Sequence, residues 1–123
     1  MRIAWIGIGG AAGAMTRYAV EAWVSARAQA SFPFGTLVVN VTGCFMLGFI
    51  IAVTSQRFIA HSTLRAALAV GFLGAYTTFS TFAFDSMRLA EEGSVGRAAV
   101  NVVASIAAGL LAVVAGTWLG RSV

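Results

Sequence analysis

The residues most able to do chemistry in this sequence lie between Gly71 and Phe82, in the string GFLGAYTTFSTF. Two glycines and four serine or threonine hydroxyls stand here in the middle of a long apolar segment. Glycine, serine and threonine all weaken a helix, so we predict a break between Gly74 and Phe79. The alternative is a continuous helix whose hydroxyls donate hydrogen bonds back to its own carbonyls.

A break in this segment would release main-chain carbonyls from their helical partners. If the segment spans a membrane, each carbonyl left facing lipid costs several kcal/mol. The released carbonyls must therefore line a cavity, contact a second chain or bind a cation.

Uncharged polar side chains recur at helical spacing in two other apolar segments. Side chains three or four residues apart lie on one face of a helix. One set is Thr36, Asn40 and Gly43, and the other is Asn101, Ser105 and Gly109. Amides and hydroxyls donate hydrogen bonds, so these faces can line an ion path without trapping the ion by a full charge. The alternative is that they only join helices, each bond contributing about 0.6–2 kcal/mol.

Two further residue pairs each contain a side chain that can interact with an anion. Phe79 and Phe82 stand three residues apart beside the expected break, and the edge of an aromatic ring carries partial positive charge. Arg17 and Glu21 stand four apart, which favours an ion pair on a helix. Arg17 has two possible roles: it attracts anions to a pore mouth, or it is only an anchor paired with Glu21. The two phenylalanines likewise either face an anion or only pack against other side chains.

Long apolar segments must position these residues. Apolar residues make up 59% of the chain and charged residues 10%, against about 45–50% and about 25% in soluble domains. Residues 32–56, 66–84 and 98–120 carry no charge, and each run matches the roughly 20 residues of a membrane-spanning helix. A fourth span is expected over 3–26, where the side chain of Arg17 can reach the interface.

These observations predict an all-α membrane protein. We expect four transmembrane helices in a single domain over residues 1–123, with the third helix broken near its middle. The linkers are short, at 27–31, 56–63 and 88–96, and none is large enough to fold by itself. The pairs Gly9/Gly13 and Gly116/Gly120 are GxxxG motifs that let helix backbones approach closely in lipid.

The arginines predict how the helices insert. The chain has eight arginines and no lysine. The membrane side with both termini and the second linker carries Arg2, Arg57, Arg65 and Arg121, and the other side carries Arg27, Arg88 and Arg97. An excess of Lys and Arg on the cytoplasmic side normally sets orientation, and four against three is no clear excess. We therefore predict dual topology, with an antiparallel homodimer as the working unit.

Several classes of function are disfavoured by the residue content. The single cysteine, Cys44, cannot form an intramolecular disulfide, and the single histidine, His61, lies in a linker without ligand partners. We find no nucleophile–base pair and no phosphate-binding loop, so we do not expect an enzyme. The arginines lie mostly at helix ends, as membrane anchors do, and form no basic and aromatic stripe, so no nucleic-acid partner is expected.

Taken together, these residues resemble the Fluc (CrcB) family of fluoride channels. The matching strings are GGAAGA at 9–14 with Arg17 and Tyr18, FGTLVVN at 34–40 with Gly43, and GFLG at 71–74 with TTFSTF at 77–82. They cover three of the four expected helices, and the string of the third is the most specific. The fourth helix is the least diagnostic, because Asn101 stands where family members often carry Tyr.

The resemblance implies a passive channel that exports fluoride from the cytoplasm through two pores in an antiparallel dimer. By this likeness, the residues of the fluoride path would be Asn40, Phe79, Phe82 and Ser105, with further hydroxyl donors at Thr36 and Thr81. Arg17 would lie near a vestibule. A structural sodium ion would lie at the dimer centre on main-chain carbonyls of Gly74 and Thr77 from each chain. The membrane would be a bacterial-type plasma (inner) membrane, crossed several times.

Two other functions remain open. Proton-coupled antiporters of the small multidrug-resistance type are also small, four-helix, dual-topology proteins. They need a membrane-embedded carboxylate in the first helix, and here Glu21 stands late in that helix, beside Arg17. The second alternative is a membrane scaffold that transports nothing, in which the glycines and hydroxyls serve only helix packing.

Overall fold

The computed structural model describes residues 1–56 and 62–123. Within them every regular element is helical, as the all-α class predicts. The elements are α1 (Arg2–Ala28), α2 (Phe34–Gln56), α3 (Ser62–Arg65), the π-helix η1 (Ala66–Leu73), α4 (Gly74–Tyr76), α5 (Phe79–Glu91) and α6 (Val95–Ser122). Arg57 and His61 lie outside the described residues, so the expectations placed on them stay predictions.

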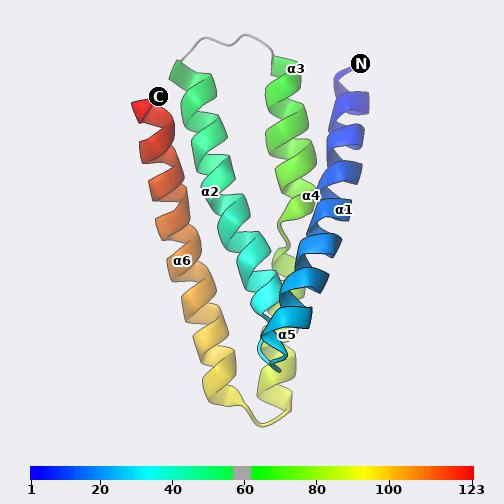
Figure 1. Cartoon of the computed structure of the whole chain (residues 1–123), viewed down its shortest axis with the longest axis vertical. Coiled ribbons are helices and arrows are strands. Elements are labelled where there is room, and N and C mark those ends of the chain that lie inside the picture. Colours follow the sequence, from blue (N-terminus) through cyan, green and yellow to red (C-terminus); the bar gives the residue numbers. More distant parts are fainter. Residues whose placement is uncertain (57–61) are drawn as a thin grey trace.

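The helices lie side by side in one elongated bundle (Figure 1). α1 runs away from the N-terminus, α2 returns, α3 to α5 run away again, and α6 returns, so both chain ends lie at one end of the bundle. α2 packs mainly on α6, and α1 mainly on η1. The connections 29–33 and 92–94 lie together at the opposite end, as the sequence predicts for the first and third linkers.

Among the described residues, three helical stretches are long and apolar enough to cross a membrane: Phe34–Ser55, Ser62–Glu91 and Val95–Ser122. They coincide with the three charge-free runs, whose assignment as candidate spans is thereby confirmed. Large apolar side chains on their surfaces are exposed, among them Leu111 at 71%. Such a surface suits hydrocarbon and not water, so the chain is a membrane protein. α1 is 27 residues long but is not one of these three stretches.

The stretch Ser62–Glu91 is interrupted at Thr77 and Thr78, between α4 and α5. Thr77 has φ −82° and ψ 156°, and Thr78 has φ −147° and ψ 111°, so both are extended. The predicted break between Gly74 and Phe79 is therefore confirmed, and the continuous helix is wrong. One hydrogen bond of the kind that the alternative predicts is present: the Thr77 hydroxyl donates to the carbonyl of Leu73 at 2.9 Å.

Glycines bring the helix backbones together within the chain. A side chain at Gly9 would overlap the carbonyl of Ala67, and one at Gly13 would overlap the carbonyl of Phe72, so α1 touches η1 backbone to backbone. In the same way, a side chain at Gly116 would overlap the carbonyl of Phe45, on the seam between α2 and α6. Both GxxxG motifs thus lie in contacts between helices of one chain.

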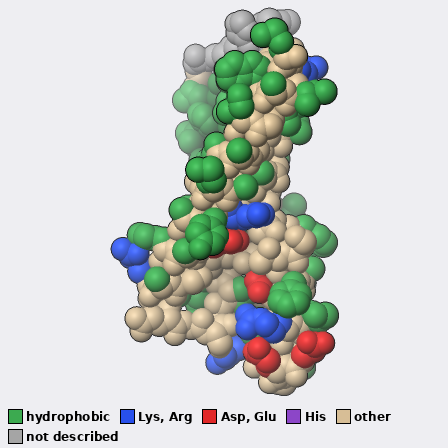
Figure 2. All heavy atoms as spheres, turned by 90° about the vertical axis from the view of Figure 1, so that its right-hand side faces the viewer, with side chains coloured by type: hydrophobic (Ala, Val, Ile, Leu, Met, Phe, Trp, Pro, Cys, Tyr) green, Lys and Arg blue, Asp and Glu red, His purple; other side chains and the backbone are tan. Residues whose placement is uncertain are grey.

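The third linker is shorter than expected. We predicted a connection over 88–96, but α5 continues to Glu91 and α6 begins at Val95. Arg88 prolongs the helix by pairing with Asp85 at 3.8 Å and with Glu92 at 3.4 Å. The chain then reverses at Gly93, whose φ of 81° suits glycine. On the face seen in Figure 2, most charged side chains gather toward this end of the bundle.

Candidate functional site

A groove of about 320 Å³ opens beside the break in the stretch Ser62–Glu91. Its walls come from α2, from the segment η1 to α5, and from α6. Six residues that the sequence singles out lie in these walls: Asn40, Gly74, Thr77, Phe79, Phe82 and Ser105. The structure therefore brings together polar and aromatic side chains from three separate helices at the depth of the break.

Asn40 joins α2 to the extended segment of the break. Its Nδ2 donates to the carbonyl of Thr78 at 3.0 Å, and its Oδ1 accepts from the N–H of Thr78 at 2.7 Å. The amide oxygen thus replaces the helical acceptor that the Thr78 N–H lacks, as a buried backbone group requires. Gly43, one turn further on, lets α2 come this close, because any side chain there would overlap the Thr77 methyl group.

The break turns two N–H groups away from their usual acceptors. In a continuous helix, the N–H groups of Thr78 and Thr81 would donate to the carbonyls of Gly74 and Thr77. Here Thr78 donates to Asn40, and Thr81 donates to the Thr78 hydroxyl at 3.2 Å. Thr78 caps α5 in the usual way of a threonine. The carbonyls of Gly74 and Thr77 are thereby released from these two bonds, beside the groove.

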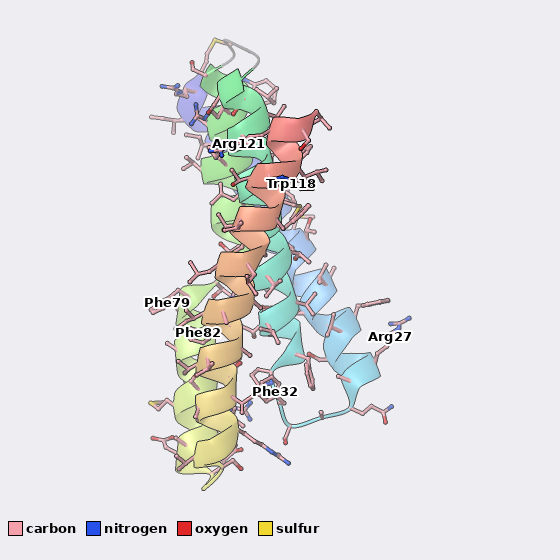
Figure 3. The ribbon with its side chains drawn as sticks, turned by 90° about the vertical axis from the view of Figure 1, so that its left-hand side faces the viewer. Arg27, Phe32, Phe79, Phe82, Trp118 and Arg121 are labelled. Atoms are coloured by element: carbon pink, nitrogen blue, oxygen red, sulfur yellow. The ribbon has the colours of Figure 1, made fainter. Side chains whose placement is uncertain are left out.

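Phe79 and Phe82 project from the first turn of α5, beside α6 (Figure 3). Their ring centroids are 5.6 Å apart and the planes are inclined by 51°. The Phe79 side chain is exposed in the single chain, at 78% of its surface. The Phe79 ring therefore forms part of the groove wall, and no other described residue of the same chain covers most of it.

Two polar residues of α6, Ser105 and Asn101, have different surroundings. Ser105 lines the groove, and no hydrogen bond joins its hydroxyl to another residue in the described part of the chain. Asn101, one turn earlier, is 1% exposed and donates from Nδ2 to the Ser86 hydroxyl at 2.9 Å. The sequence left the role of Asn101 open, and the structure assigns it to the α5–α6 contact.

Thr36 and Thr81 do not lie in the groove. They line a second hollow of about 340 Å³ toward the end of the bundle, together with Glu21, Asp85 and Arg88. The Thr36 hydroxyl donates to Asp85 Oδ2 at 3.0 Å, and the Thr81 hydroxyl accepts from Thr78 at 2.9 Å. Thr36 shares a face with Asn40 but lies four residues away, about 6 Å along the helix axis, and that displacement puts it in the next hollow.

The expected ion pair between Arg17 and Glu21 is not formed. No contact within 4 Å joins these side chains among the ion pairs of residues 1–56 and 62–123. Glu21 interacts electrostatically with both Arg17 and Asp85, and its Oε1 is buried without a hydrogen-bond partner in the described chain. Arg17 lines neither hollow.

Sequence reasoning missed two residues of the hollows as functional candidates. Asp85 was not singled out, although it stands four residues after Thr81 and so shares its helix face. Cys44 was considered only as a cysteine that cannot form an intramolecular disulfide, but it lines the groove beside Leu47 and Ile106. Its position four residues after Asn40 is the signal that would have identified it.

Comparison with known proteins identifies the family of this chain. Residues 4–117 match the family described as "CrcB-like protein, Camphor Resistance (CrcB)". Two relatives named "Fluoride-specific ion channel FluC" come from Acidobacterium capsulatum (42% identical, covering 100% of this chain and 95% of the relative) and Geobacter metallireducens (43%, covering 98% and 94%). A third of that name, from Methylococcus capsulatus, is 47% identical over 94% of this chain and 51% of its own length. These relatives are named as channels and not as enzymes, and the chain belongs to the CrcB-like family.

Proposed function

We propose that this chain is a passive fluoride-selective ion channel, which lets fluoride leave the cytoplasm down its gradient. Membership of the family and the name of the relatives support this function. The observation that carries it is the groove, where Asn40, Ser105 and two phenylalanine rings meet beside a broken helix. A membrane path of this kind needs polar groups at a depth where lipid offers none.

The lining of the groove suits a small, strongly hydrated anion. Asn40 Nδ2 uses one of its two protons on Thr78, which leaves the other for an ion. The Ser105 hydroxyl and the ring edges of Phe79 and Phe82 add further positive ends. These groups replace lost hydration without a full charge, and such weak and multiple sites let an ion leave as well as enter.

We propose that a second, oppositely inserted copy of the chain closes the groove. The groove is open on one side, and Phe79 beside it is 78% exposed. The near balance of arginines between the two ends supports insertion in both orientations. Because an antiparallel pair is symmetric, it contains two grooves and hence two pores. A C-terminal tag detected on only one side of the membrane in every cell would reject the dual topology.

α1 is the proposed fourth span. Its 27 residues make about 40 Å of helix, against a hydrocarbon core of about 30 Å. It packs along η1 by close backbone contact at Gly9 and Gly13, which supports a position inside the same bilayer. Residues 1–123 then form one four-helix domain in the lipid of a bacterial-type plasma (inner) membrane.

We also propose a structural sodium ion where the breaks of the two copies meet. The Gly74 and Thr77 carbonyls are each released from a helical bond, and rings of main-chain carbonyls bind alkali cations in channels. Two carbonyls from each copy fit such a site. No cluster of His, Cys, Asp and Glu able to hold a metal occurs in the described part of the chain, so main-chain oxygens are the donors that fit.

Release of fluoride from liposomes tests the proposed function. The purified chain is reconstituted with potassium fluoride inside, valinomycin carries the compensating potassium, and an external electrode follows fluoride. We expect rapid release of fluoride and none of chloride from matched liposomes. Silence toward both anions would favour the scaffold, and release that requires an opposing proton gradient would favour the antiporter.

A further inference from the structure

Asn101 on α6 is a polar side chain that the proposed fluoride path does not use. It is 1% exposed, although its neighbours on that helix are largely apolar. A buried amide is tolerated only where it is hydrogen-bonded, and Asn101 Nδ2 donates to the Ser86 hydroxyl of α5 at 2.9 Å. This contact ties α6 to the second turn of α5.

Ser86 passes the contact on to the groove. Its hydroxyl donates to the carbonyl of Phe82 at 2.8 Å, and a serine bonded back in this way affects the local bend of a helix. A continuous hydrogen-bonded chain therefore runs from Asn101 through Ser86 to Phe82, the residue whose ring forms part of the groove.

α5 has few other supports. It packs chiefly on α6, has only slight contact with α2, and begins at the break, where Asn40 holds Thr78. Two asparagines from different helices thus fix the short helix that carries both rings, one at its start and one a turn beyond Phe82. Small movements of α5 would move the rings relative to Asn40 and Ser105.

We propose that Asn101, acting through Ser86, is a positioning residue that sets where Phe82 lies in the groove. The test of this proposal by fluoride turnover rests on the proposed channel function. A merely structural role predicts something different: loss of Asn101 would then reduce how many channels fold, and each folded channel would conduct as before.

Dilute reconstitution separates these two roles. When most liposomes hold at most one channel, the fraction of liposomes that empty reports folded channels, and the rate of emptying reports fluoride turnover. The variants are Asn101→Leu, which keeps a similar volume without donors, and Ser86→Ala, which removes the same bond from the other side. Ser122→Ala is the matched control, because Ser122 also donates to a carbonyl four residues back, that of Trp118, far from the groove.

We expect each of the two variants to lower turnover about 3-fold to about 20-fold, the range given by one hydrogen bond between membrane helices. The emptying fraction should stay unchanged, Ser122→Ala should match the unmodified chain, and the double variant should be no slower than the slower single one. Unchanged turnover in both single variants, or a loss confined to the emptying fraction, would overturn the proposal. Should Asn101→Leu fail to insert, Ser86→Ala decides.

A second readout does not depend on transport. 4-Fluorophenylalanine placed at position 82 gives a ¹⁹F resonance that reports the surroundings of that ring. Asn101→Leu should shift this resonance and Ser122→Ala should not, and identical spectra would overturn the positioning role. An unmodified chain that released no fluoride would reject the channel, while the spectra would still decide what Asn101 does.

Discussion

The side-chain amide of Asn40 forms two hydrogen bonds with the main chain of Thr78, one as donor at 3.0 Å and one as acceptor at 2.7 Å. Asn40 of α2 thereby supplies the acceptor for the Thr78 N–H at the point where the stretch Ser62–Glu91 is broken. The same amide borders the groove and keeps one proton free. The break and the proposed ion path therefore depend on one side chain.

Replacing Asn40 tests this dependence. Asn40→Ala removes both bonds, so we expect the free energy of unfolding to fall by about 1–3 kcal/mol and fluoride release to be lost. Denaturant titration in detergent and liposome release measure the two effects. Thr54→Val is the control on the same helix, because the Thr54 hydroxyl bonds back to carbonyls of its own helix, those of Ile50 and Ile51. Equal stability and flux in Asn40→Ala and Thr54→Val would contradict the role of Asn40.

The two rings of α5 give a second prediction. Phe79→Ile and Phe82→Ile keep apolar bulk but remove the ring edges that would face an anion. We expect each to lower fluoride release at least about tenfold, a loss of about 1.4 kcal/mol, while size-exclusion chromatography still finds a folded dimer. Phe84→Ile is the matched control, since Phe84 is an exposed ring of the same helix that does not line the groove. Full flux in both variants would reject the ring-edge path.

The approach of α1 to η1 predicts a sharp difference between two glycines. A methyl group at Gly13 would overlap the Phe72 carbonyl, whereas one at Gly7 would meet nothing within 4 Å. Gly13→Ala should therefore lower stability by about 1–3 kcal/mol through overpacking, and Gly7→Ala should leave it within about 0.5 kcal/mol. Thermal unfolding in detergent compares them. Similar melting temperatures would mean that α1 does not pack as described.

Glu21 distinguishes the channel from a proton-coupled antiporter. Its Oε1 is buried without a hydrogen-bond partner in the described chain, and it faces Asp85 across the second hollow. Glu21→Gln removes a charge that is not part of the groove, so we expect fluoride release to stay within about twofold of the unmodified chain, or about 0.4 kcal/mol. Abolished transport would instead assign Glu21 the role of the coupling carboxylate.

The sequence predicted the features that depend on local chemistry. The three apolar spans follow from missing charge, and the break follows from glycine and threonine at mid-depth, where the structure has Thr77 and Thr78 extended. Asn40, Phe79, Phe82 and Ser105 line one groove, and helical spacing had already placed Asn40 and Ser105 on the polar faces of their helices.

The features that depend on contacts between helices were less predictable. Helical spacing placed Thr36 on the same face as Asn40. Only the position of α5 in the bundle brings Asp85 within hydrogen-bond distance of the Thr36 hydroxyl. Arg17 and Glu21 have the spacing of an ion pair, yet Glu21 lines a hollow that also holds Asp85. The role of Asn101 stayed open for the same reason, since its partner Ser86 lies on another helix.

The single cysteine of the chain tests most directly whether fluoride passes through the groove. Cys44 lines it one turn from Asn40, so methyl methanethiosulfonate should attach there and obstruct the path, with labelling checked by mass spectrometry. We predict that labelling lowers fluoride release from liposomes at least about tenfold, or about 1.4 kcal/mol, and that Cys44→Ser is unaffected by the reagent. Fully labelled protein that releases fluoride at the unlabelled rate would contradict the account.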